Sequence, residues 1–315
     1  MNGLTNDTRD TESHCSIYSP VLLVMGEKRV LLIIIVANVF LMLTASLGNV
    51  SILLSFLCVP SLRSTSNYLL FGLALSDLCV GLVVHPSYIA VIYNLYNESI
   101  PHCAVLFIYM IATSFLGTVS VMTITVIGMD RYLAIRLNLR YQEFVTERRS
   151  TMVLIVLWLT CGLSCLVWIE GFRVYIAFTT FVVTVSLFVI CVIYVKLYSV
   201  VRRHKTQISR QTVAWKTDYV EKVRQRRLHK STINTLYVFF TFLVCYLPFF
   251  VSMTVHNLSR LENKQTVIAI EFAITLMLSN SSLNPLMYGF RLREFRVAVK
   301  KTYRILFCSS QTSQG

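Results

Sequence analysis

The sequence predicts an all-α fold, a bundle of seven transmembrane helices followed by a short amphipathic eighth helix. Charged residues make up 14% of the 315 residues and hydrophobic residues 55%. That mix excludes a disordered chain and disfavours a soluble globule. Seven apolar stretches are long enough to cross a bilayer, which takes about 20 helical residues. They and their connections use nearly the whole chain, so we expect no second domain.

The seven predicted spans alternate with polar connections. They cover residues 30–58, 68–94, 103–129, 151–169, 174–198, 232–256 and 266–290. Their length excludes outer-membrane β-strands, which run about 9–11 residues with alternating polarity. Residues 1–29 are polar and precede a full-length span, so they do not resemble a cleavable signal peptide. We expect an outer segment over 1–29, a membrane domain over 30–290 and an inner tail over 291–315.

Basic residues are distributed unevenly between the two sides of the predicted bundle. The chain has 29 Lys and Arg residues against 15 Asp and Glu, and 23 of the 29 fall on the C-terminal side when connections alternate. Because Lys and Arg favour the cytoplasm, we predict that the N-terminus lies outside and the C-terminus inside. This basic rim either only sets topology and contacts anionic membrane lipid, or docks a cytoplasmic partner. It does not indicate a nucleic-acid partner.

Asn-x-Ser/Thr motifs agree with this orientation. Asn6, Asn97 and Asn257 each begin such a motif in a predicted outer segment, where a glycan can be attached. Two further motifs, at Asn49 and Asn280, fall within spans, where glycan transfer is implausible. We therefore predict glycans at the first three positions only.

Asp77 is a lone carboxyl group in the second predicted span. An ionisable residue inside a membrane indicates function by default, and no basic residue lies at similar depth in another span. The small polar residues that could surround it are Asn49, Ser120, Asn280, Ser281 and Asn284. Their oxygens suit a hard cation such as Na⁺ or a protonated acid. A polar cluster that only holds helices together is the alternative.

Two motifs end spans on the predicted cytoplasmic side. Asp130-Arg131-Tyr132 ends the third span, where the arginine can extend to the interface and pair with the aspartate. Asn284-Pro285-x-x-Tyr288 ends the seventh span, where the proline removes a backbone hydrogen bond and kinks the helix. Pro248 does the same in the sixth span. Two kinked spans beside a long basic loop indicate helices that can swing.

Together these residues resemble the rhodopsin-like (class A) G-protein-coupled receptors over about residues 30–308. Every span carries a family marker, in order: Gly48-Asn49-Val50, Leu75-Ser76-Asp77, Asp130-Arg131-Tyr132, Trp158, Tyr194, Cys245-x-x-Pro248 and Asn284-Pro285-x-x-Tyr288. An amphipathic segment from Phe290 to Val299 resembles the family's eighth helix, which lies on the inner leaflet.

The resemblance implies a receptor, not an enzyme, that converts extracellular ligand binding into activation of a heterotrimeric G protein, with arrestin as a further partner. Asp130 would hold Arg131 at rest, and Arg131 would contact the G protein when active. The implied coupling residues are Asp130, Arg131, Tyr132, Tyr194, Asn284, Pro285 and Tyr288. Leu228 stands where many members place an acid that pairs with the arginine, which predicts some basal signalling.

Two further sites follow from the resemblance. The family's sodium pocket maps onto Asp77, Ser120, Asn280 and Ser281, so Na⁺ is expected as an allosteric ion and no cofactor is required. Cys308, after the amphipathic segment, is a possible palmitoylation site.

The chain also departs from the family pattern. The connection between spans four and five is very short and has no cysteine, whereas members usually tie that loop to the third span by a disulfide. Of nine cysteines, only Cys15 and Cys103 are expected in the oxidising exterior. We predict a Cys15–Cys103 disulfide, with two free thiols as the alternative. The short loop resembles the melanocortin, cannabinoid and lysophospholipid receptors, to which the adenosine receptors are close.

The family geometry places a ligand pocket between spans three, five, six and seven. Its candidate residues here are Ser87, Thr113, Gly117, Tyr246, Phe249, Phe250, Met253, Glu271 and Ile274. Thr113 stands where amine receptors carry an aspartate, so the ammonium of a simple biogenic amine would lack its usual counter-ion. A lipid, a hydrophobic small molecule or a peptide is favoured instead. Glu271 either serves a cationic ligand or is a solvated helix end.

Other classes of protein fit less well. A secondary transporter is the main alternative, since Asp77 and two proline-bearing spans also suit broken transporter helices, but there is no internal repeat. An intramembrane enzyme needs paired acids, a zinc motif or a Ser/Lys dyad, and no span offers one. His85 beside Pro86 is a lone histidine of the kind that is more often structural than catalytic. Residues 265–290 contain no lysine for retinal, which excludes an opsin.

Overall fold

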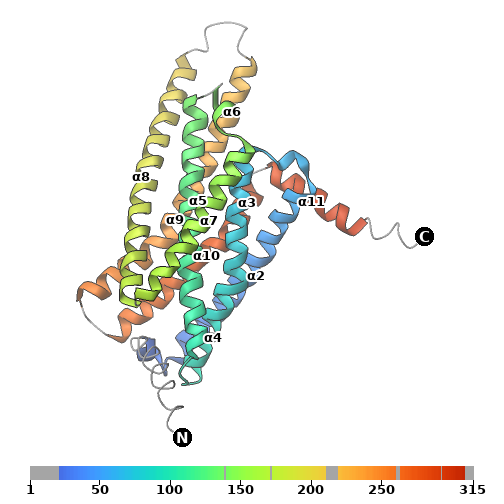
Figure 1. Cartoon of the computed structure of the whole chain (residues 1–315). Helices are drawn as coiled ribbons and strands as arrows, with labels where there is room; N and C mark the ends of the chain where they lie inside the picture. The colour runs from blue at the N-terminus through green and yellow to red at the C-terminus, as the bar shows by residue number, and fades with distance from the viewer. Residues whose placement is uncertain are drawn as a thin grey trace. The chain divides into compact units, whose positions relative to one another are not determined.

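The computed structural model describes residues 21–137, 140–170, 172–210, 219–259, 263–291 and 293–308. Every regular element in these ranges is helical. Seven helices are long and apolar enough to cross a membrane. The predicted all-α, seven-helix class is therefore confirmed, and Figure 1 traces the helices in chain order.

The seven spans run longer than their apolar cores. They are built from α2 (Lys28–Cys58), α3 (Thr65–Cys79) with α4 (His85–Tyr96), α5 (Cys103–Leu137), α7 (Glu147–Ser164), α8 (Phe172–Arg210), α9 (Tyr219–Ser259) and α10 (Lys264–Arg291). Helix α8 continues beyond the predicted end of its span, and α9 begins before the predicted start of its own. The prediction counted apolar residues only, whereas backbone hydrogen bonds continue through polar and basic flanks. Short elements fill several connections: η2 (Val21–Val24), η3 (Pro60–Leu62), α6 (Tyr141–Phe144) and η6 (Cys165–Glu170).

The second span contains a π-helical turn that the sequence analysis did not predict. This turn, η4 (Val80–Val84), joins α3 to α4 immediately before His85 and Pro86. Proline lacks a backbone N–H and clashes with the preceding turn, and a π-bulge is one way for a helix to accommodate it. The other two span prolines, Pro248 and Pro285, lie inside α9 and α10 as predicted.

The amphipathic eighth helix is present as α11 (Arg293–Cys308). The prediction of its nature is confirmed, but its bounds were wrong: the helix starts three residues after Phe290 and ends nine after Val299. Its buried residues Phe295, Ala298 and Thr302 recur at helical spacing. The first two pack in one apolar cluster with residues of α2, η3, α3 and α9. This continued apolar stripe explains the longer helix.

The chain divides into two compact units, each built from three stretches of sequence. The first unit comprises Met1–Gly48, Asp77–Ser114 and Phe242–Leu283, and the second comprises Asn49–Ser76, Phe115–Thr241 and Asn284–Gly315. In the first, Gly81 lets two helices approach closely, because a Cβ there would lie 2.6 Å from Ser46 Oγ. In the second, Phe115 packs edge-on against Trp158, with ring centroids 5.9 Å apart.

Candidate functional site

Asp130 and Arg131 form an ion pair in α5, within the second unit. Arg131 Nη2 lies 3.0 Å from Asp130 Oδ2, and the two side chains are only 12% and 4% exposed. Little water screens a pair at this depth, so the charges interact more strongly than surface ion pairs do. This geometry is the one that the Asp130-Arg131-Tyr132 motif predicts for a resting arginine.

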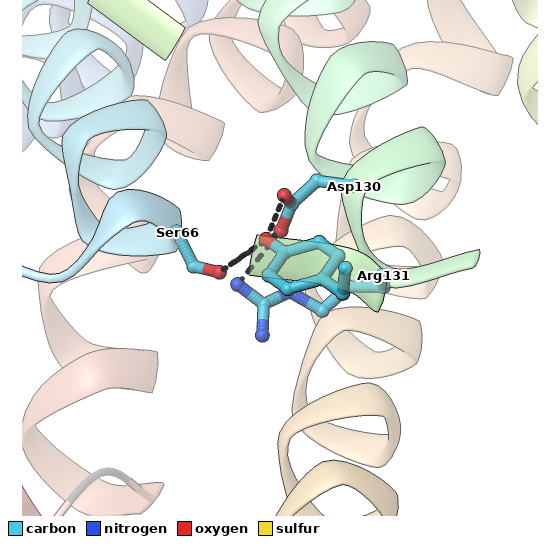
Figure 2. Close-up of polar contacts among 4 residues, drawn as sticks. Ser66, Asp130 and Arg131 are labelled. Carbon is cyan, nitrogen blue, oxygen red and sulfur yellow. Dashed lines mark hydrogen bonds and ion pairs between the residues drawn. The ribbon is translucent and has the colours of Figure 1, made fainter. Parts of the chain in front are cut away.

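Two residues that the sequence analysis missed donate hydrogen bonds to the Asp130 carboxylate. Tyr141, in α6, donates its hydroxyl to Oδ1 at 2.5 Å. Ser66, in α3, donates to Oδ2 at 3.0 Å, and Figure 2 shows it facing Asp130 and Arg131. Burial and then the Asp130 charge raise the pKa of the Tyr141 hydroxyl, so it stays protonated and donates. No local pattern marks Ser66 or Tyr141, because only the tertiary fold brings them to the carboxylate.

The other predicted coupling residues occupy separate environments in the second unit. Tyr132 accepts a hydrogen bond from Arg136 at 2.9 Å. Tyr194 is buried and stacks on Phe239 at 4.1 Å between ring centroids. Its ring also lies against Gly128, where a Cβ would come within 2.7 Å of it. A side chain at position 128 would therefore displace Tyr194.

The structure describes the Asn284-Pro285-x-x-Tyr288 motif except for one side chain. Asn284 is buried in α10 and Pro285 lies inside the same helix. Tyr288 also falls in α10, but its side chain lies outside the described residues.

The predicted sodium ligands are all buried. In the first unit, Asp77, Asn280 and Ser281 are each less than 5% exposed. Both polar side-chain atoms of Asn280 are buried without a hydrogen-bond partner in the described part of the chain. In the second unit, Ser120 is buried and its hydroxyl lies 3.3 Å from that of Ser76. Carboxylate, amide and hydroxyl oxygens are ligands that suit a hard monovalent cation.

The ligand-pocket candidates divide between the units, with Gly117 in the second and the others in the first. Tyr246 and Ile274 are buried, and Phe249 and Phe250 pack edge-on at 5.9 Å. Ser87, in α4, donates back to the Val83 carbonyl of η4 at 2.7 Å. Thr113 Oγ1 is buried with no hydrogen-bond partner among the described residues. Met253 is half-buried, and a Cβ at Gly117 would meet open space.

Glu271 is not the solvated helix end that the sequence left as one option. Its side chain in α10 is 2% exposed, and its Oε2 accepts a hydrogen bond from Tyr88, in α4, at 2.6 Å. Tyr88 is itself buried and stacks on Tyr109, in α5, with centroids 5.1 Å apart. The first unit therefore holds a second buried carboxyl group besides Asp77, and its hydrogen-bond donor is one of two stacked tyrosines.

The remaining predicted modification sites are described unevenly. Cys103 is disulfide-bonded, while Cys15, its predicted partner, lies outside the described residues, as Asn6 does. Asn97 is exposed just after α4. Asn257 and Cys308 fall in helices, but their side chains lie outside the described residues. The disulfide pairing, the glycans and the palmitoyl group stay predictions.

Residues 48–173 and 168–288 match the family described as 7 transmembrane receptor (rhodopsin family). The chain therefore belongs to the rhodopsin family of seven-transmembrane receptors, which is a family of receptors and not of enzymes. This membership makes it a multi-pass membrane protein, as its seven apolar helices also indicate.

Curated relatives match along most of the chain. Adenosine receptor A3 of Ovis aries is 26% identical over 86% of this chain and 88% of the relative. Histamine H2 receptor of Rattus norvegicus is 27% identical over 85% of this chain and 78% of the relative, and that of Homo sapiens is 27% identical over 88% and 79%. The predicted neighbourhood of the adenosine receptors is confirmed, and the histamine receptors were not predicted.

Proposed function

We propose that this protein is a plasma-membrane receptor that converts the binding of an extracellular ligand into activation of a heterotrimeric G protein. Its N-terminus lies outside the cell and its C-terminus inside. The observation that supports this most directly is the Asp130–Arg131 pair, held at 3.0 Å in a member of the rhodopsin receptor family. Tags at both termini should report opposite faces of the cell, and tags on the same face would contradict this orientation.

The pair supplies a resting state that a ligand can overcome. Arg131 forms an ion pair with Asp130, and Ser66 and Tyr141 donate hydrogen bonds to the Asp130 carboxylate. An agonist that binds the active state better shifts the population by its difference in affinity alone. Helix α9 then moves about Pro248, Arg131 leaves the carboxylate, and the G protein takes its place. Arrestin uses the same cytoplasmic face.

Sodium acts on the same equilibrium in this proposal. Asp77, Asn280 and Ser281, all buried in the first unit, are the residues that would hold the ion. A bound Na⁺ supplies positive charge beside a deep carboxylate, and so favours the resting state if the site contracts around it.

The sequence, the relatives and the predicted pocket residues each bear on the chemical class of the ligand. The sequence favours a lipid, a hydrophobic small molecule or a peptide, because Thr113 offers no carboxylate. Relatives named for adenosine and for histamine bring nucleosides and amines back into consideration. The pocket candidates of the first unit combine aromatic residues with one buried acid, Glu271.

A G-protein activation screen tests the function. The unmodified chain and Arg131→Ala are expressed at matched surface levels and tested with lipid, nucleoside, peptide and amine libraries. We expect ligand-dependent nucleotide exchange in the unmodified chain and none in Arg131→Ala. Arg29→Ala is the matched control, because Arg29 is an exposed arginine at the start of α2, outside the basic rim. Exchange that persists in Arg131→Ala, or ligand-dependent uptake without exchange, would overturn the proposal.

A further inference from the structure

The first unit contains a buried acid for which the described chain provides no cation. Glu271 has one side-chain partner, the Tyr88 hydroxyl at 2.6 Å. Two ion pairs of the same unit use other acids: Lys28 pairs with Glu98, and Lys264 pairs with Glu27. A carboxylate removed from water is costly unless it is paired with a cation or protonated. The missing charge must come from a proton or from a bound molecule.

The neighbours of Glu271 suit an organic cation better than a metal ion. The Tyr88 hydroxyl donates to the carboxyl group, and the Tyr88 ring stacks on Tyr109. Aromatic faces attract ammonium groups. Within the described residues there is no group of three or more His, Cys, Asp or Glu side chains that could hold a metal ion. A carboxylate whose hydrogen-bond donor is one of two stacked tyrosines can bind an ammonium group.

A second observation in the same unit is a buried histidine nitrogen without a hydrogen-bond partner among the described residues. Asn38 uses its amide nitrogen to donate to Ile34 O at 2.9 Å and to Thr275 Oγ1 at 3.1 Å. Its oxygen is therefore the acceptor for His85 Nδ1 at 3.1 Å, which makes Nδ1 the protonated ring nitrogen. The other ring nitrogen, Nε2, is buried and has no partner in the described ranges, on a side chain that is 0% exposed.

Hydrogen bonds connect the histidine to the backbone of Glu271. Thr275, which receives the Asn38 bond, donates in turn to the Glu271 backbone carbonyl at 3.1 Å. These bonds join α2, α4 and α10 but do not reach the Glu271 carboxyl group. In the described residues that carboxyl group has no cation, and His85 Nε2 has no donor. Buried polar groups are normally satisfied, so each such exception needs an explanation.

We propose that Glu271 is the counter-ion for the ammonium group of an amine ligand, with His85 Nε2 available to accept a second hydrogen bond from the same molecule. This inference rests on the proposed receptor function and assigns its ligand class. An amine was disfavoured because Thr113, in α5, carries no carboxylate. In this proposal Glu271, in α10, supplies the counter-ion instead.

Thermal unfolding of the purified full chain in detergent tests the proposal without any G protein. The probes are histamine, tyramine and phenethylamine, each beside its N-acetyl form, with adenosine as a neutral nucleoside. The free amines are protonated at neutral pH and the N-acetyl forms are not. We expect at least one amine to raise the melting temperature of the unmodified chain, its N-acetyl form to have no effect, and adenosine to have none.

Glu271→Gln then assigns the effect to the carboxyl group, because the amide can still accept the Tyr88 bond. We expect it to weaken amine binding about 30-fold or more, as loss of a buried charge partner does. Glu98→Gln is the matched control at an exposed acid and should bind like the unmodified chain. Amines without effect, N-acetyl forms equal to amines, or unchanged binding in Glu271→Gln would each overturn the proposal.

The N-acetyl comparison needs no variant, so the proposal stays testable if Glu271→Gln does not fold. Failure of the proposed function is separate: it would appear as an amine that binds but drives no Arg131-dependent exchange.

Discussion

Two buried acids, one in each unit, have opposite environments. Asp130 is 5% exposed and has a guanidinium and two hydroxyl donors, all from the chain. Glu271 is 2% exposed and has a single tyrosine hydroxyl. Where the described chain supplies a cation, the charge is balanced, and we propose that this pair is a lock that activation releases. Where it supplies none, we propose that a ligand balances the charge.

The largest expected effect comes from breaking the balanced acid. Asp130→Asn removes the carboxylate that holds Arg131, so the resting state loses an ion pair whose side chains are largely buried. We expect basal nucleotide exchange to rise about tenfold or more, which corresponds to ~1.4 kcal/mol of lost preference. The measurement is ligand-free exchange at matched surface level.

Glu147→Gln is the control for Asp130→Asn. Glu147 is an exposed acid of the same unit that accepts a hydrogen bond from Tyr68 at 3.1 Å. It should leave basal exchange unchanged. Equal basal exchange in Asp130→Asn and the unmodified chain would mean that the described pair does not restrain Arg131.

A second variant tests the unbalanced acid through stability. Tyr88→Phe removes the hydroxyl group that donates a hydrogen bond to Glu271, and so leaves the buried carboxyl group without that donor. We expect a loss of about 1–3 kcal/mol, the cost of an unsatisfied buried group, and a fall in melting temperature of about 2–4 °C for each kcal/mol. Tyr93→Phe, at an exposed tyrosine of the same helix, should not change it. If both variants melt alike, the Tyr88 bond carries no stability.

The fold was predictable because length and apolar composition determine which segments can cross a membrane. All seven spans were found, and the markers placed Asp130 and Arg131 together. Helix ends were less predictable, since apolar counting cannot detect a helix that continues through the basic residues of α8 and α9. The π-turn before Pro86 was also missed, and the longer α11 depends on packing.

The sites were predictable in proportion to how local they are. Asp130 and Arg131 are neighbours in sequence, so a motif reveals them. Ser66 and Tyr141 lie 64 and 11 residues from Asp130, and nothing near them in the sequence indicates that contact. For the same reason Glu271 could be read as a solvated helix end, because Tyr88 is 183 residues away. Burial of an acid is a tertiary property.

The smallest expected effect comes from weakening the balanced acid without breaking it. Tyr141→Phe removes one of three groups that hold the Asp130 carboxylate and leaves Arg131 and Ser66 in place. We expect basal exchange to rise less than in Asp130→Asn, about fivefold for a hydrogen bond worth ~1 kcal/mol. Tyr198→Phe, at an exposed tyrosine of α8, is the matched control and should not change it.

The pH dependence of this difference separates a hydroxyl donor from a phenolate. Burial and the Asp130 charge raise the Tyr141 pKa above its ordinary value of about 10. The folded chain therefore prefers the protonated hydroxyl, and its contribution is complete below that value and is lost only as pH rises through the raised pKa. The ratio of basal exchange between Tyr141→Phe and the unmodified chain should stay constant up to about pH 9. A ratio that approaches one near neutral pH would show that the hydroxyl loses its proton there, and that Asp130 is held by Ser66 and Arg131 alone.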